Sequence, residues 1–142
     1  MHEYFEDVST AEEYTFGTYA VSREEIVSFA ESYDPQPFHL GETEDSMFDG
    51  VVASGWHTAA MTMRLLVDNY LAESGALGAV GLDELRWPAP VRPGDKLSVR
   101  LTFADPEPWD ENRGLVHQLV ETTTQSGETV LWLDARVLYR RR

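Results

Sequence analysis

The stretch that decides the fold runs from Gly55 to Glu73 and reads GWHTAAMTMRLLVDNYLAE. Its apolar residues recur every three or four positions, the spacing that places side chains on one face of an α-helix. We therefore predict one long helix over this range, with a single broad buried face. The residues expected on that face are Ala59, Ala60, Met63, Leu66, Val67, Tyr70 and Leu71.

The chain after this helix has the pattern of β-strands. Apolar and polar residues alternate with a period of two, which is typical of strands that bury one face. Four strands are expected, over residues 79–87, 96–103, 115–125 and 129–139. The clearest alternations place Leu97, Val99, Leu101 and Phe103 on one face, and Leu131, Leu133, Ala135, Val137 and Tyr139 on another.

One strand and one shorter helix are predicted ahead of the long helix. Residues 15–21 have the β-branched and aromatic content of a strand. Ser22 and Glu25 form a capping box for a helix over residues 23–33, which Asp34 ends because it precedes a proline. One strand, a helical segment and four successive strands indicate an α+β fold, with the long helix held against a curved antiparallel sheet. Open sheet edges are often closed by dimerisation, so we expect at least a homodimer.

The composition limits the partners of the protein. At 142 residues the chain is expected to form one domain, residues 1–142, with residues 1–14 as an N-terminal extension that is free to move. The net charge of −14 repels nucleic acid and anionic membranes, so neither is expected as a partner. Acidic residues number 25 and Lys96 is the only lysine, a balance that halophilic proteins use in strong brine.

Cysteine usage and the terminal sequence limit the chemistry and the compartment. The chain contains no cysteine, which excludes disulfides, thiolate zinc sites and cysteine nucleophiles. The acidic start lacks the basic-then-apolar pattern of a secretion signal, and no apolar run approaches membrane-spanning length. We therefore expect a cytoplasmic protein.

Asp34 and His39 are the first candidates for catalysis. They stand five residues apart on a loop that Pro35 and Pro37 restrict, which lowers the cost of holding two polar side chains in a fixed relation. A carboxylate and an imidazole held in this way can share a water molecule and move its protons. Taken singly, an aspartate before proline is more often a helix stop, and such a histidine is more often a loop residue that the backbone satisfies.

Gly55 is the next candidate, because its backbone N–H opens the long helix. That N–H has no acceptor inside the helix, and the macrodipole adds positive potential there, so a carbonyl oxygen that gains negative charge would be stabilised. A glycine kept for close packing is the alternative. Ser54 and His57 adjoin it as candidate substrate-binding residues, although Ser54 lacks the flanking glycines of a nucleophile elbow and such a histidine is more often a packing residue.

Trp87 is a candidate for the wall of a substrate pocket, together with Trp56, Met61 and Met63, although such residues are more often plain core. No metal site is expected. His39, His57 and Asp49 are the only combination near the candidate loop, and their spacing matches no trusted ligand pattern.

The candidate loop and its surroundings resemble a known family. Tyr33-Asp34, Pro37, His39 and residues 53–55, preceded by Phe29-Ala30, resemble the motif of the MaoC-like dehydratases, or (R)-specific enoyl-CoA hydratases. Residues 90–95, PVRPGD, resemble the stretch that precedes a sheet strand in the same family. The likeness covers most of the chain after Thr15.

This resemblance implies a hot-dog fold and a reaction. A long helix would be wrapped by an antiparallel sheet, usually in a dimer with the acyl-CoA site near the subunit interface. The catalytic residues of the family fall on Asp34 and His39, and its oxyanion-binding glycine falls on Gly55. The implied reaction adds water across a 2-enoyl-CoA to give an (R)-3-hydroxyacyl-CoA. It uses no metal or redox cofactor, since CoA is part of the substrate.

Two other functions fit the same resemblance. An acyl-CoA thioesterase of the same fold would use a carboxylate to direct water to the carbonyl carbon and would release free CoA. A non-catalytic acyl-CoA-binding or partner subunit would keep the fold without turnover. Gln36, which stands where the family usually has asparagine, is the one local feature that favours this last reading.

Overall fold

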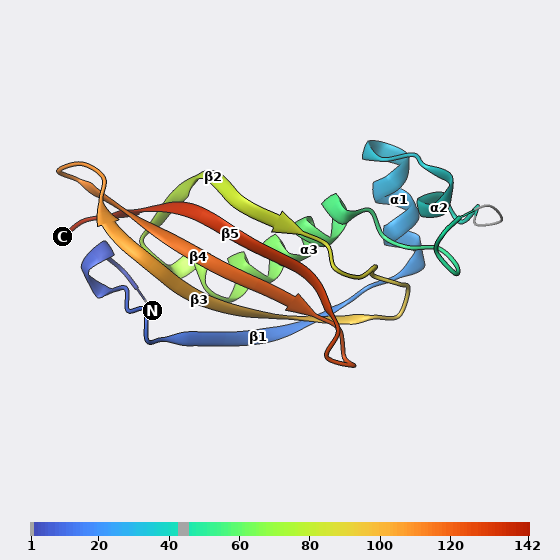
Figure 1. Cartoon of the computed structure of the whole chain (residues 1–142), viewed down its shortest axis with the longest axis horizontal. Coiled ribbons are helices and arrows are strands. Elements are labelled where there is room, and N and C mark those ends of the chain that lie inside the picture. Colours follow the sequence, from blue (N-terminus) through green and yellow to red (C-terminus); the bar gives the residue numbers. More distant parts are fainter. Residues whose placement is uncertain (1, 43–45) are drawn as a thin grey trace.

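The computed structural model describes residues 2–42 and 46–142. A five-stranded antiparallel sheet curves around one long helix, α3 (Gly55–Asn69), as Figure 1 shows. The strands are β1 (Glu13–Ala20), β2 (Ala76–Arg86), β3 (Lys96–Pro108), β4 (Arg113–Thr123) and β5 (Thr129–Arg140). The other helices are α1 (Arg23–Tyr33), α2 (Pro37–Leu40) and two 3-10 turns, η1 (Phe5–Asp7) and η2 (Leu71–Glu73). The predicted α+β hot-dog fold is confirmed.

The sheet supplies one wall of the core. Its strand order is β1-β3-β4-β5-β2, so β1 and β2 lie at the two edges. The alternation predicted for the third and fifth strands is confirmed, because the residues expected to face inward are largely buried against α3. These are Leu97, Val99, Leu101 and Phe103 on β3, and Leu131, Ala135, Val137 and Tyr139 on β5.

The long helix has its predicted start, and Leu66 and Tyr70 are buried as predicted, but the rest of the predicted buried face is largely wrong. Met63 and Val67 were expected inside, yet 51% and 38% of their surfaces are exposed. The buried residues are His57, Thr58, Met61, Thr62, Leu65 and Leu66. Threonine can be buried here because the Thr62 hydroxyl forms a 2.7 Å hydrogen bond with that of Thr122 on β4. The helix also ends earlier than expected, at Asn69, and η2 follows it.

The N-terminal residues are packed, unlike the mobile extension expected from the sequence. His2 is 3% exposed, and its ring nitrogens lie 2.9 Å from the Tyr70 hydroxyl and 2.9 Å from the Glu12 carboxylate. The backbone N–H of Gly75 donates to the carbonyl of His2. Residues 2–12 therefore cover the end of the sheet that lies near the C-terminus of α3.

Short helices α1 and α2 gather at the opposite end of the molecule, beside the N-terminus of α3 (Figure 1). The Ser22 hydroxyl accepts a hydrogen bond from the N–H of Glu25, as the capping box predicts. The Glu25 carboxylate accepts instead from the Tyr19 hydroxyl at 2.5 Å, which ties α1 to β1. Among the described residues, no helix is long and apolar enough to cross a membrane.

Candidate active site

Asp34 and His39 come together because a helix ends and another begins within a few residues. Asp34 is the C-terminal cap of α1, and its N–H still donates to the carbonyl of Ala30. Pro37 occupies the first turn of α2, where its missing N–H costs nothing. The short helix turns the His39 ring back toward α1. Nε2 of His39 then lies 3.3 Å from Oδ2 of Asp34.

The backbone fixes which nitrogen of His39 faces the carboxylate. Nδ1 lies 2.7 Å from the carbonyl oxygen of Val52, and a carbonyl only accepts, so Nδ1–H is the donor. Nε2 therefore carries a lone pair in the neutral ring and a proton only in the imidazolium. The His39 side chain is 7% exposed and that of Asp34 is 18% exposed. One proton can be held between Nε2 and Oδ2, or one water molecule can hydrogen-bond to both atoms.

Gln36 holds the other carboxylate oxygen. Its side-chain amide donates to Oδ1 of Asp34 at 2.6 Å, which leaves Oδ2 for His39. Burial raises the pKa of Asp34, but hydrogen bonds from Gln36 and Ser54 and the charge of His39 outweigh it, so the pKa is lowered. Asp34 is thus ionised at neutral pH. The glutamine side chain therefore braces the segment between Asp34 and His39.

The N-terminus of α3 forms the second part of the site. The Ser54 hydroxyl caps the helix by accepting from the N–H of Trp56. The N–H of Gly55 has no acceptor within residues 2–42 and 46–142. The indole of Trp87 lies directly over this turn, because a methyl group at position 55 would be 2.6 Å from Cε2 of Trp87. Glycine is required here by close approach.

One cavity of about 530 Å³ joins these groups. Asp34, His39, Ser54, Gly55 and Trp87 all line it. The rest of the wall is mainly apolar and includes Phe38, Phe48, Val52 and Trp56. Residues that carry a carboxylate, an imidazole and an unbonded helix N–H therefore line one mainly apolar cavity, and these are the groups that general acid-base chemistry beside a developing oxyanion needs.

His57 does not join this cavity, although the sequence made it a candidate. Its ring stacks on Phe29 of α1, with ring centres 4.7 Å apart and planes inclined by 8°. Its Nδ1 is a buried side-chain atom without a hydrogen-bond partner in the described part of the chain. Burial lowers the pKa of His57, although the charge of Glu25 opposes the shift. The ring packs α3 against α1 and is neutral at pH 7.

The other residues expected to line the pocket lie in three different places: at the cavity, in the core and at the surface. Trp56 lines the cavity and meets Trp87 edge to face, with ring centres 5.2 Å apart. Met61 is buried in the core and Met63 points to the surface, so neither lines it. Sequence reasoning missed Phe38 and Phe48, whose rings lie 5.4 Å apart. Phe38 directly precedes His39 in the sequence, and this position next to a candidate catalytic residue could have identified it as a residue of the cavity wall.

Among the residues that the structure describes, the side chains near this cavity that could bind a metal do not form a cluster. Across the described ranges, no three carboxylate or imidazole groups converge on it, and His57 faces away from His39. The combination of His39, His57 and Asp49 that the sequence offered is therefore not a ligand set.

Comparison with known proteins identifies the family. The family profile described as the MaoC like domain matches residues 7–126. The chain belongs to the MaoC-like family. A MaoC-like dehydratase from Rhodospirillum rubrum has a similar solved structure, with 40% identity, a TM-score of 0.89, and coverage of 98% of this chain and 97% of that one.

Two further relatives of this MaoC-like chain are similar to it, one in structure and one in sequence. The R-hydratase PhaJ1 from Pseudomonas aeruginosa shares the fold, with a TM-score of 0.77 at 21% identity over 99% of this chain and 88% of that one. YdeM of Bacillus subtilis, described as an uncharacterized protein, is 28% identical over 85% of this chain and 87% of its own length. The family and the fold are therefore established. The reaction depends on the residues of the cavity.

Proposed function

We propose that the protein is a hydratase that interconverts 2-enoyl-CoA and (R)-3-hydroxyacyl-CoA. The observation that carries the proposal is the 3.3 Å approach of Nε2 of His39 to Oδ2 of Asp34, in a cavity that the N-terminus of α3 also lines. The R-hydratase and dehydratase named among the structural relatives support this reaction class.

The proposed mechanism is addition of water to an activated double bond. The oxygen of a water molecule held between Asp34 and His39 attacks C3, and the electrons of the double bond shift toward the thioester carbonyl. The pair accepts a proton from this water and returns one to C2, so protons balance over the cycle. The Gly55 N–H and the dipole of α3 stabilise the enolate oxygen. Since the two side chains share the proton, they act as one coupled base.

The cavity favours an apolar acyl group. Phe38, Phe48 and Val52 supply a wall close to the imidazole, while the indoles of Trp56 and Trp87 flank the first turn of α3. Apolar walls also exclude bulk water, so the attacking water is the one that Asp34 and His39 hold. No cofactor beyond the CoA of the substrate enters the proposal.

We also propose that the protein is a homodimer. Strand β2 is at the edge of the sheet, and Leu77, Val80 and Leu82 on it are 57%, 51% and 48% exposed. An exposed apolar edge strand is a template for pairing with a second chain. The exposed Met63 and Val67 of α3 supply further apolar surface of the kind that a second copy would cover.

A panel of 2-enoyl-CoA thioesters of different length tests the reaction. We expect loss of the enoyl absorbance with purified protein, formation of the (R)-3-hydroxyacyl product, and no free thiol. Release of free CoA from acyl-CoA substrates, detected with a thiol reagent, would instead identify a thioesterase. Tight binding of the thioesters without either change would identify a binding subunit and overturn the proposal.

A further inference from the structure

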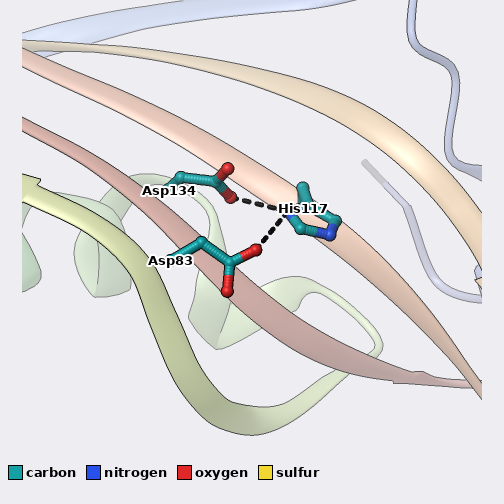
Figure 2. Close-up of side chains that lie close together, drawn as sticks. All are labelled: Asp83, His117 and Asp134. Carbon is teal, nitrogen blue, oxygen red and sulfur yellow. Dashed lines mark hydrogen bonds and ion pairs between the residues drawn. The ribbon is translucent and has the colours of Figure 1, made fainter.

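The outer face of the sheet carries three metal-ligating side chains from three neighbouring strands. Asp83 on β2, His117 on β4 and Asp134 on β5 point toward one another (Figure 2). Nδ1 of His117 lies 2.7 Å from Oδ1 of Asp134 and 3.7 Å from Oδ2 of Asp83. One ligand atom from each residue lies within 4.8 Å of the others.

The strand register explains why these residues meet. His117 pairs with Arg136 across β4 and β5, so Asp134, two residues along β5, is its diagonal neighbour on the same face. Asp83 is the residue that a register shift leaves without a partner, because Leu82 pairs with Ala135 and Glu84 with Asp134. Such bulges re-aim a side chain. Here the bulge brings the Asp83 carboxylate to the imidazole.

This cluster is separate from the candidate active site. Val116 and Gln118, which flank His117 on β4, are buried on the inner face, and Gln118 donates to the Tyr139 hydroxyl there. Because successive strand residues alternate between faces, His117 points to the side of the sheet away from α3. The catalytic cavity contains none of the three residues.

We propose that Asp83, His117 and Asp134 form a binding site for a divalent first-row transition ion such as Zn²⁺. One imidazole nitrogen and two carboxylate oxygens are a mixed set that suits Zn²⁺ or Co²⁺ better than Mg²⁺ or Ca²⁺, which prefer oxygen alone. Three protein ligands leave a fourth position for water. The two carboxylates concentrate negative charge at this point, and the His117 side chain, only 13% exposed, is held in place by its surroundings.

Arg136 is the feature that distinguishes an ion site from a purely ionic network. Its guanidinium lies 3.7 Å from the Asp83 carboxylate and therefore competes with a cation for that ligand. If the cluster binds an ion, removing this competing charge strengthens binding. If the cluster only serves to pair Arg136 and His117 with acids, the same change has no such effect.

Ion binding would hold the edge strand β2 to its neighbours in the sheet. Asp83 belongs to β2, and the other two ligands belong to the strands that follow it in the sheet, β5 and β4. An ion held by all three would bind the folded protein and not the unfolded chain, and would raise the melting temperature with increasing ion concentration. This effect is independent of hydratase activity, so failure of one proposal does not affect the other.

Calorimetric titration of the chelator-treated full-length protein with Zn²⁺ tests the site, and Co²⁺ absorption reports its geometry. We expect one ion per chain, and His117→Gln and Asp83→Asn should each weaken binding by about tenfold to a hundredfold or more. Arg136→Gln should strengthen it. Glu84→Gln removes an acid from the neighbouring position on β2 and should leave it unchanged.

Two results would overturn the site. The first is binding that His117→Gln and Glu84→Gln reduce equally, which is what diffuse attraction of cations to a chain of net charge −14 produces. The second is the lack of any saturable binding of Zn²⁺ or Co²⁺ by either the wild-type protein or Arg136→Gln. Circular dichroism of each variant confirms that the sheet is intact.

Discussion

Gly55 and Trp87 lie close together at the first turn of α3, where we propose that the substrate carbonyl binds. We expect Gly55→Ala to lower kcat/KM by roughly tenfold to a hundredfold, because the new methyl group would lie 2.6 Å from the indole and must displace it. The double variant with Trp87→Leu relieves this clash, so its loss should be smaller than the product of the two single losses. Steady-state kinetics on a 2-enoyl-CoA measures both. Full activity of Gly55→Ala would contradict the close approach.

His57 should make stability depend on pH. Burial lowers its pKa below the ordinary value of 6.5, so the unfolded chain binds this proton at a higher pH than the folded chain does. The free energy of unfolding therefore falls as the pH drops below about 6.5 and through the lowered pKa. His57→Phe keeps an aromatic ring against Phe29 and removes the orphan nitrogen.

Urea unfolding at about pH 8 and about pH 5.5 measures this dependence. We expect His57→Phe to lose less stability on acidification than the wild type. If His57→Phe and wild type lose stability equally, the ring does not carry the effect.

At the scale of single residues, the sequence predicts the position of those site residues that depend only on the neighbouring backbone. Asp34, Gln36 and His39 lie between the end of α1 and the end of α2, so two prolines and two helix ends are enough to bring them together, although His39 is in a short helix and not in the loop that the sequence predicts. The sequence does not predict the orientation of His57, which depends on the face that α3 presents to α1. His117 is another example, since its partners are set by strand register and by a bulge.

Strand β2 is the edge strand that we propose pairs with a second chain. We expect Val80→Arg to weaken dimerisation by at least about a hundredfold, because pairing at this edge would bury an unpaired charge. Sedimentation of wild type and variant over a range of concentrations measures the effect. Trp109→Arg is the control, since Trp109 is 47% exposed just beyond the end of β3 and away from β2. A wild-type protein that is monomeric at micromolar concentration would contradict the proposal.

The elements were predictable in kind and order, and less so in detail. Period-two alternation identified β3 and β5 most clearly, because each has one face against the core, whereas β2 is exposed along most of its length. The buried face of α3 was not predictable, since apolar residues surround most of the helix and several overlapping stripes satisfy the same spacing. The hydrogen bond between Thr62 and Thr122 stabilises a buried face that contains threonine, a residue that hydropathy alone would place at the surface.

Across the whole molecule, charge should couple stability to salt. With 25 acidic and 11 basic residues, self-repulsion destabilises the folded state at low ionic strength, and salt screens it. We expect the melting temperature to rise from about 0.1 M to molar KCl, where the screening length falls from about 10 Å to about 3 Å. Replacing the exposed Glu24, Glu31 and Glu111 by glutamine should reduce this rise. A melting temperature that is flat in KCl would exclude a halophilic design.

The packing of the N-terminus shows the limit of sequence reasoning at this scale. The His2 ring is hydrogen-bonded to the Tyr70 hydroxyl, and the Tyr70 hydroxyl is hydrogen-bonded to that of Tyr139. Together these two hydrogen bonds connect residues near the two ends of the chain. No local pattern predicts contacts between residues so far apart. The motif around Asp34 and the stretch over residues 90–95, by contrast, were sufficient to suggest the family that the profile match establishes.

The central claim is that Asp34 and His39 together move the protons of one water molecule. Initial rates of crotonyl-CoA hydration by Asp34→Asn and His39→Ala test it most directly, with circular dichroism to show that each variant is folded. We predict that each loses roughly two to four orders of magnitude in turnover, the usual contribution of general acid-base catalysis. Wild-type turnover in either folded variant would contradict the claim.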